Sequence, residues 1–159
     1  MKVCYIARKK RHRVFTGYAA KDKNSMGWFF GLKLHLVINN RGELMACSIT
    51  RASTDDRKPL PKLVEKLKGW LFVDKRYLGK SLADELKAQA MEIFTKVRKN
   101  MKKRIINKAQ KFFLSKRGII ETVIDHLKNC YHIEHSRHRS LVNAFVNIIF
   151  SLIAELILF

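Results

Sequence analysis

Residues 69–97, GWLFVDKRYLGKSLADELKAQAMEIFTKV, decide the fold class of this chain. A short apolar run typical of a buried strand ends at Asp74, a helical segment follows with Leu82 and Leu86 four residues apart, and a second short strand closes the stretch. A strand, a helix and a strand in this order predict two parallel strands joined by a crossover helix. We therefore expect an α/β fold.

A second strand pair precedes this unit. In GLKLHLVI, residues 31–38, large apolar residues alternate, and ELMACSITR, residues 43–51, follows an Asn-Arg-Gly turn. Strand patterns on both sides of such a turn predict an antiparallel hairpin. The hairpin and the parallel pair together predict one mixed sheet flanked by helices. Thr54 or Asp55 is expected to cap a helix over residues 57–68.

The length of 159 residues and the hydrophobic content of 47% predict a single domain with a core of its own. Its expected parts are a basic arm over residues 1–25, the hairpin and strand-helix-strand core over 28–97, a basic segment over 98–117 and C-terminal helices over 115–159. In the last helix the polar residues recur every four positions and form one stripe, which is typical of a helix docked on a protein core. These residues are Asn143, Asn147, Ser151 and Glu155.

The charge of the chain points to an anionic partner. Thirty-three Lys and Arg residues against 13 Asp and Glu residues leave a net charge of +20, far more than solubility requires. Nucleic acid is the first candidate and an anionic membrane surface the second. Residues 96–117 contain ten bases and no acid, a pattern that fits either a solvated surface or a segment that contacts phosphates.

The cysteines and the chain ends bear on the compartment. Cys4, Cys47 and Cys130 are odd in number and widely spaced, which favours reduced thiols in a cytoplasmic protein over disulfides. The N-terminal sequence has no apolar run of signal-peptide length. The apolar C-terminal run, residues 141–159, is just long enough to span a membrane, but its polar stripe favours packing on protein, and no membrane association is expected.

Two acids differ from the others in their surroundings. Asp74 ends a buried strand, where it could cap the next helix or bind a metal ion. Glu121 lies among apolar residues of a helix, with Arg117 four residues before it and Lys128 seven residues after it. That spacing fits a surface salt-bridge ladder, and it equally fits a carboxylate that holds a divalent cation between two bases that grip a phosphodiester.

Seven segments of the chain resemble, in order, those of bacterial DDE-type insertion-sequence transposases, most closely the branch called insertion sequence nine-eighty-two. The segments are HRVFTGYA (12–19), SMGWFFGLKLHLVIN (25–39), TDDRKPL (54–60), LFVDKRYL (71–78), RKNMK (98–102), IIETVIDHLK (119–128) and IEHSRHRS (133–140). The resemblance implies a ribonuclease-H-like mixed sheet, two Mg or Mn ions, and cleavage and joining of transposon and target DNA. A homo-oligomer stays open as a second partner.

By this resemblance Asp74 and Glu121 are the second and third acids of the catalytic triad and two of its metal ligands. The DNA-binding residues that it implies are Lys75, Arg98, Lys99, Lys102, Arg117, Lys128, Arg137 and Arg139. The chain departs from the family at Leu114, where related transposases have tyrosine, and at Val73 and Arg76, where the family has glycine near the second acid.

The first acid of the family lies on a strand before the segment that matches residues 3–15, and no Asp or Glu occurs here before Asp22. We therefore expect a C-terminal transposase fragment that lacks the first core strand, binds DNA and is catalytically defective. The alternative is a basic nucleic-acid-binding protein without enzymatic activity. The Cys130, His132, His135 and His138 cluster has no familiar zinc spacing, and a zinc site is not expected there.

Overall fold

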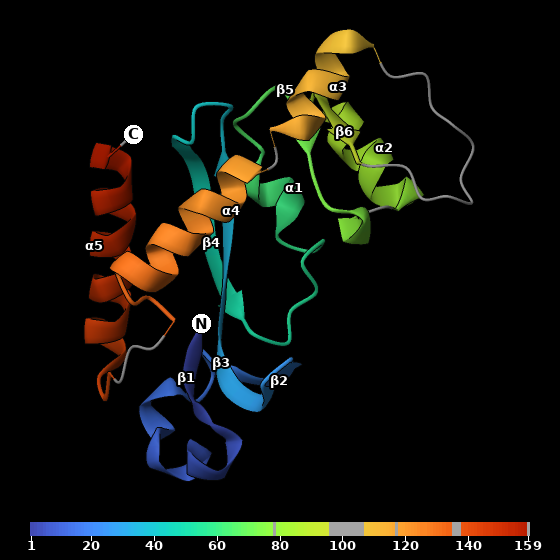
Figure 1. The fold of residues 1–159 in the computed structure, drawn as a ribbon. Helices are drawn as coiled ribbons and strands as arrows, with labels where there is room; N and C mark the ends of the chain where they lie inside the picture. The colour runs from blue at the N-terminus through green and yellow to red at the C-terminus, as the bar shows by residue number, and fades with distance from the viewer. Residues whose placement is uncertain (78, 96–106, 117, 135–137, 159) are drawn as a thin grey trace.

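The computed structural model describes residues 1–77, 79–95, 107–116, 118–134 and 138–158, and Figure 1 shows their arrangement. The long strand β3 runs through the middle of the molecule, with α4 and α5 on one side of the hairpin and the second, smaller sheet towards the other (Figure 1). The first elements are β1 (Lys2–Tyr5), η1 (Ile6–Arg11), η2 (Arg13–Phe15), β2 (Ala20–Asn24), β3 (Gly27–Ile38) and β4 (Leu44–Arg51).

The predicted hairpin is confirmed. Residues 32–38 of β3 pair with β4 in antiparallel register, for example Leu36 with Cys47. The side chain of Asn39 closes the turn by accepting hydrogen bonds from the backbone amides of Arg41 (2.9 Å) and Glu43 (3.1 Å). Asparagine is favoured in turns because its side chain can accept hydrogen bonds from nearby backbone amides in this way. The turn was therefore predictable from a few residues of sequence.

Residues 1–25 differ from the irregular basic arm that was expected. Strands β1 and β2 flank the first half of β3 as antiparallel neighbours and both meet it at Gly31. Two 3-10 turns, η1 and η2, connect them. Phe15 is 1% exposed and packs with Cys4 and Phe30, and burial of these apolar side chains explains why so basic a segment is folded.

The predicted strand-helix-strand unit is also confirmed. Its elements are β5 (Gly69–Phe72), η3 (Lys75–Tyr77), α2 (Lys80–Ala88) and β6 (Met91–Phe94), and β5 pairs with β6 in parallel. Leu82 and Leu86 are buried against this pair, as their spacing predicted. The helix expected over residues 57–68 is shorter, because α1 spans only Leu60–Leu63 and begins at Pro59 without a side-chain cap.

The single mixed sheet that was expected is not formed by the described residues. β5 and β6 make a two-stranded sheet of their own, and β1 to β4 make the other. The two sheets meet through side chains rather than hydrogen bonds: Leu60 and Val64, in and just after α1, and Val37 of β3 pack in the same cluster as Leu71 of β5. The fold is therefore mixed α/β, with two sheets joined by an apolar cluster.

The C-terminal part is helical. It contains α3 (Lys108–Ser115), α4 (Gly118–Asp125), the π-helical turn η4 (His126–Cys130) and α5 (Leu141–Leu158). Asn107 and Gln110 form a capping box at the start of α3, with the Asn107 side chain accepting from the Gln110 amide at 2.8 Å. The first of the C-terminal helices expected over residues 115–159 is thus α4 continued by η4.

Helix α5 docks on the core of the protein, and part of its polar stripe faces inward. Ser151 and Glu155, from its polar stripe, are 4% and 2% exposed. The carboxylate of Glu155 lies 3.5 Å from the ring of His126 in η4. Large apolar side chains of α5 face outward instead, among them Ile149, Phe150 and Ile157. The face of α5 that packs on the core carries the buried residues Ala144, Ile148 and Leu152. Ser151 and Glu155 lie on this same face and are therefore buried with them.

Candidate active site around Asp74

Asp74 lies at the carboxyl end of β5, at the point where the parallel pair ends. The amide of Val73 still donates to the carbonyl of Phe94 (3.0 Å), which extends the ladder by one residue, and the carbonyl of Asp74 then accepts from the amide of Tyr77 (3.0 Å) and starts η3. The N-cap position of α2 is occupied by Gly79 and not by Asp74. The carboxyl ends of parallel strands are where α/β proteins place their ligand sites.

The Asp74 carboxylate is accessible to solvent. Its side chain is 46% exposed, and its Oδ2 lies 3.9 Å from Nε of Arg76, which is itself 83% exposed. An ion pair this long and this exposed contributes little to stability. Arg76 thus gives Asp74 a loose cationic neighbour.

Tyr77 marks a region on which three carboxylates converge. The pKa of Tyr77 is raised to about 12, mainly by burial and then by the negative charges of Asp56, Asp74 and Asp55, in that order. A phenol that feels three carboxylates at once lies near all of them. Tyr77 was not predicted as a site residue, although it belongs to the segment LFVDKRYL that carries the family resemblance.

The other two carboxylates, Asp56 and Asp55, have closer basic partners than Asp74 has in Arg76. Asp56 lies 3.0 Å from Nζ of Lys33, which also donates to the carbonyl of Thr54 (2.8 Å) and so ties this loop to β3. Asp55 accepts three side-chain hydrogen bonds from Arg57, at 2.6, 3.0 and 3.3 Å, and this contact lowers the pKa of Asp55. These acids therefore shape the loop beside Asp74; neither caps α1 by a side-chain hydrogen bond.

His35 is buried on β3, and its Nε2 lies 2.8 Å from the hydroxyl of Thr50. Burial lowers the pKa of His35; the negative charge of Asp56 opposes this shift, and the positive charge of Lys33 adds to it. The unfolded chain, in which a histidine has a pKa of about 6.5, thus binds the proton more readily than the folded protein. The contribution of His35 to stability is complete above pH ~6.5 and is lost as the pH falls below that value.

Replacement of His35 by glutamine is therefore expected to flatten the decrease in the free energy of unfolding between pH 7 and pH 5. Urea denaturation of both proteins at a series of pH values measures this difference. Parallel pH profiles for the two proteins would show that His35 does not titrate on unfolding.

Glu121 lies in the first turn of α4 and is exposed, while Val123, on the opposite face of the helix, is 1% exposed. Lys128, which the spacing places near Glu121, instead lies 3.2 Å from Glu134. Lys128 lies within the π-helical turn η4, which follows α4. Arg117, the other base of the expected set, lies outside the described residues.

The elements that carry Asp74 and Glu121 pack against the β3–β4 hairpin in different apolar clusters. Val37 of β3 packs with the cluster beneath β5, whereas Leu36 and Ile38 pack with the cluster of α4, η4 and α5. Successive residues of a strand point to opposite faces, so the two clusters lie on opposite sides of β3. Within the described ranges, no group of three or more His, Cys, Asp or Glu side chains is placed to hold a metal ion.

A family model described as the transposase DDE domain matches residues 1–141, about nine tenths of the chain. The chain belongs to the transposase DDE domain family. Neither the curated proteins nor the solved structures provide a further match. Membership associates the protein with DNA transposition and implies DNA as its partner, and DDE transposases typically use divalent metal ions. The described acids do not by themselves fit such an ion as a complete ligand set.

The DNA-binding residues expected of a DDE transposase are only partly described. Arg139 is exposed just before α5, and Lys75 lies in η3 directly after Asp74. Five of the expected residues lie outside the described ranges, namely Arg98, Lys99, Lys102, Arg117 and Arg137. Of the histidine cluster, His132 has a left-handed backbone (φ 50°) and His135 lies outside the described ranges.

Family members are generally soluble and cytoplasmic proteins. In the part of the chain that the structure describes, α5 is long and apolar enough to cross a membrane, as judged from length and composition. The same is true of many core helices, and this α5 buries one face on η4 and β4.

Proposed function

We propose that this chain is the DNA-binding catalytic domain of a DDE transposase of the insertion sequence nine-eighty-two branch, with Asp74 and Glu121 as its second and third catalytic acids. The observation that carries the proposal is the position of Asp74, exposed at the carboxyl end of a parallel strand pair, in a chain that matches the DDE domain over residues 1–141. The net charge of +20 supports DNA as the partner.

The edges of β3 support a ribonuclease-H-like arrangement. The amine of Met1 donates to the carbonyl of Leu32, and the amide of Leu32 donates to the carbonyl of Met1, both at 2.9 Å. These bonds continue the pairing of β1 with β3 by one residue. Gly31 accepts from Ala52 on the opposite edge, where β4 lies. Along residues 33–38 the Met1 edge of β3 has no partner strand among the described residues. In a ribonuclease-H-like fold, the central strand of the sheet lies at this edge. That strand pairs with both the hairpin and the parallel unit, and it carries the first catalytic acid.

We further propose that the chain in this form binds DNA but is defective in strand cleavage and joining. Support comes from the described acids, which do not assemble a three-ligand group, and from Val73 and Arg76 beside Asp74, which replace family glycines. Phosphoryl transfer of this kind needs its charged ligands held in place before the reaction. The alternative is a nucleic-acid-binding protein without enzymatic activity, in which Asp74 and Glu121 are ordinary surface residues. The same observation supports it, namely that the described residues contain no three-ligand group for a metal ion.

The test combines DNA cleavage with metal binding. With transposon-end DNA and Mg or Mn, we expect weak or undetectable cleavage, and we expect Mn to tighten DNA binding in a way that Asp74→Ala and Glu121→Ala abolish. Asp84→Ala, which removes an exposed acid from α2, is the matched control and should keep the Mn effect.

Two outcomes would contradict parts of this proposal. Cleavage at the rate of a full-length transposase, abolished by Asp74→Ala, would show that the chain is not defective. An Mn effect that persists in both variants would favour the non-enzymatic alternative.

A further inference from the structure

Helix α5 carries a row of apolar side chains that point away from the core. Five of them, each between 42% and 67% exposed, are Val142, Val146, Ile149, Ile153 and Leu156. They follow one another at steps of four, three, four and three residues, which places them in one line along the helix. We call these five residues the α5 seam.

The α5 seam lies opposite the face that holds the helix on the protein. Ala144, Ile148 and Leu152 are buried in the apolar clusters, and Ser151 and Glu155 are buried beside them. At 3.6 residues per turn, these residues and the seam lie on nearly opposite sides of the helix. Figure 1 shows α5 at the edge of the molecule. Docking on the core therefore leaves the seam uncovered.

The spacing of the seam favours another helix as its partner. Alternating steps of four and three residues are those at which one helix inserts its side chains between the side chains of a second helix. Helices that lie on a membrane surface typically carry Lys and Arg along their polar face, and residues 141–159 contain neither. A helix that crossed the membrane would carry Glu155 into the lipid, which is costly for a charged side chain.

The charge of the segment favours a second copy of this chain. Residues 141–159 contain one charged residue, Glu155, which is 2% exposed, whereas the whole chain has a net charge of +20. Two such molecules repel each other, and they can approach most closely where their surfaces carry no charge. A two-fold axis brings the same surface of both copies together, so an apolar seam is its own complement.

The exposed area is sufficient for such a contact. Phe150, Ile157 and Leu158 extend the seam and are 67%, 81% and 64% exposed. A fully exposed side chain of this size offers roughly 100 Å² or more, so these three residues and the seam offer on the order of 500 Å² in each copy. A stable interface needs about 1,000 Å² in total, or about half of that from each partner.

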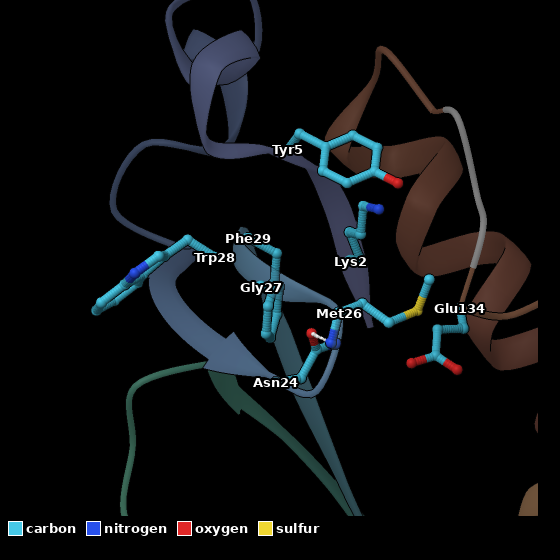
Figure 2. Close-up of a pocket in the computed structure, with 8 residues that line it drawn as sticks. All are labelled: Lys2, Tyr5, Asn24, Met26, Gly27, Trp28, Phe29 and Glu134. Carbon is cyan, nitrogen blue, oxygen red and sulfur yellow. Dashed lines mark hydrogen bonds between the residues drawn. The ribbon is translucent and has the colours of Figure 1, made fainter.

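A small hollow near the N-terminal strands does not account for this face. It is lined by Lys2, Tyr5, Met26 and Glu134, among others, and none of its lining residues belongs to α5 (Figure 2). Its volume of about 70 Å³ is far below the several hundred Å³ of typical ligand pockets. The α5 seam therefore needs a partner that covers it as a surface.

We propose that two copies of this chain associate through their α5 seams, as a two-fold symmetric pair of helices. The contact buries apolar side chains that are exposed in the single copy, and burial of apolar surface is the main favourable contribution to association. The inference goes beyond the proposed function, because it concerns a surface that carries neither Asp74 nor Glu121.

The experiment measures the mass of the full chain by sedimentation velocity, at about 0.3 M salt to screen the repulsion between copies. Between about 5 and about 200 μM, the unaltered protein should shift towards twice its chain mass of 18.6 kDa. Ile149→Glu places a charge in the middle of the seam and should stay monomeric. Phe112→Glu is the matched control, because Phe112 is 56% exposed on another helix, α3, and this variant should still dimerise.

A charge-swap pair distinguishes a lost contact from a lost fold. Ile149 lies at the middle of α5, so its two copies are neighbours whether the paired helices run parallel or antiparallel. Ile149→Lys alone should be monomeric, as should Ile149→Glu. An equal mixture of the two variants should recover the dimer, which unfolded chains could not do.

Three results would overturn the inference. They are a monomeric unaltered protein over the whole concentration range, a dimer that persists in Ile149→Glu, and a mixture of the two charge variants, both folded by circular dichroism, that stays monomeric. A monomeric unaltered protein that floats with neutral phosphatidylcholine vesicles, when Ile149→Glu does not, would assign the seam to a membrane instead. None of these measurements involves DNA, so the proposed function is tested separately.

Discussion

Raising the salt concentration from 50 to 200 mM is expected to weaken binding of this protein to duplex DNA by about 10³-fold or more. The chain carries +20 charges, and a protein that makes six or more phosphate contacts releases a similar number of counterions from the duplex. The logarithm of affinity then falls with the logarithm of salt with a slope of about −0.9 for each contact. Fluorescence anisotropy titrations at four or more salt concentrations give this slope.

A charge variant serves as the control for the salt prediction. Replacing Lys9, Lys10 and Arg11 of η1 with glutamine removes three exposed bases and should make the slope shallower by about one for each base that contacts a phosphate. A wild-type affinity that does not change with salt would contradict the prediction, because it would mean that phosphate contacts contribute little to binding.

Gly31→Ala is expected to destabilise the protein strongly, by about 1–3 kcal/mol or more. Gly31 is the residue at which both β1 and β2 meet β3, opposite Lys2 and Ala20. A Cβ atom there would collide with the backbone oxygen of Met1 and would lie 3.1 Å from the ring of Phe29. Backbone cannot swing aside as a flexible side chain can, so β1 has to separate from β3 at this point.

The melting temperature of Gly31→Ala should fall by several degrees, given about 2–4 °C for each kcal/mol in a chain of this size. Gly118→Ala is the matched control. Gly118 opens α4 with no atom within 4 Å of its Cβ position, and alanine is the better helix former. Its melting temperature should stay the same or rise slightly. Equal melting temperatures for wild type and Gly31→Ala would show that β1 does not lie against Gly31.

The hairpin and the strand-helix-strand unit were readable from the sequence because their signals are local. The alternation over residues 31–38, the Asn39 turn and the Leu82 and Leu86 spacing each act within a few residues of one another. The segment around Asp74 was readable for the same reason, since the apolar run ends where β5 ends. The family likewise followed from ordered segments along the chain and is confirmed by the match over residues 1–141.

Other features depended on partners far away in the sequence. Residues 1–25 fold because Phe15 packs against the same apolar cluster as Phe30. The two sheets are joined because Leu60 of α1 packs in one cluster with Val37 and Leu71. The ion pair of Lys128 with Glu134 joins η4 to the segment after it, and the helical spacing did not predict it.

The sequence by itself thus determined the α/β class, the main strands and helices, the family and the position of Asp74 at a strand end, because periodicity, turn chemistry and motif order are properties of short segments. Only the tertiary structure decided that the parallel pair stands apart from the hairpin, that α5 turns Glu155 inward, and that Asp74 and Glu121 belong to clusters on opposite faces of β3. These features follow from which apolar surfaces bury one another, and that choice is made among residues distant in the chain.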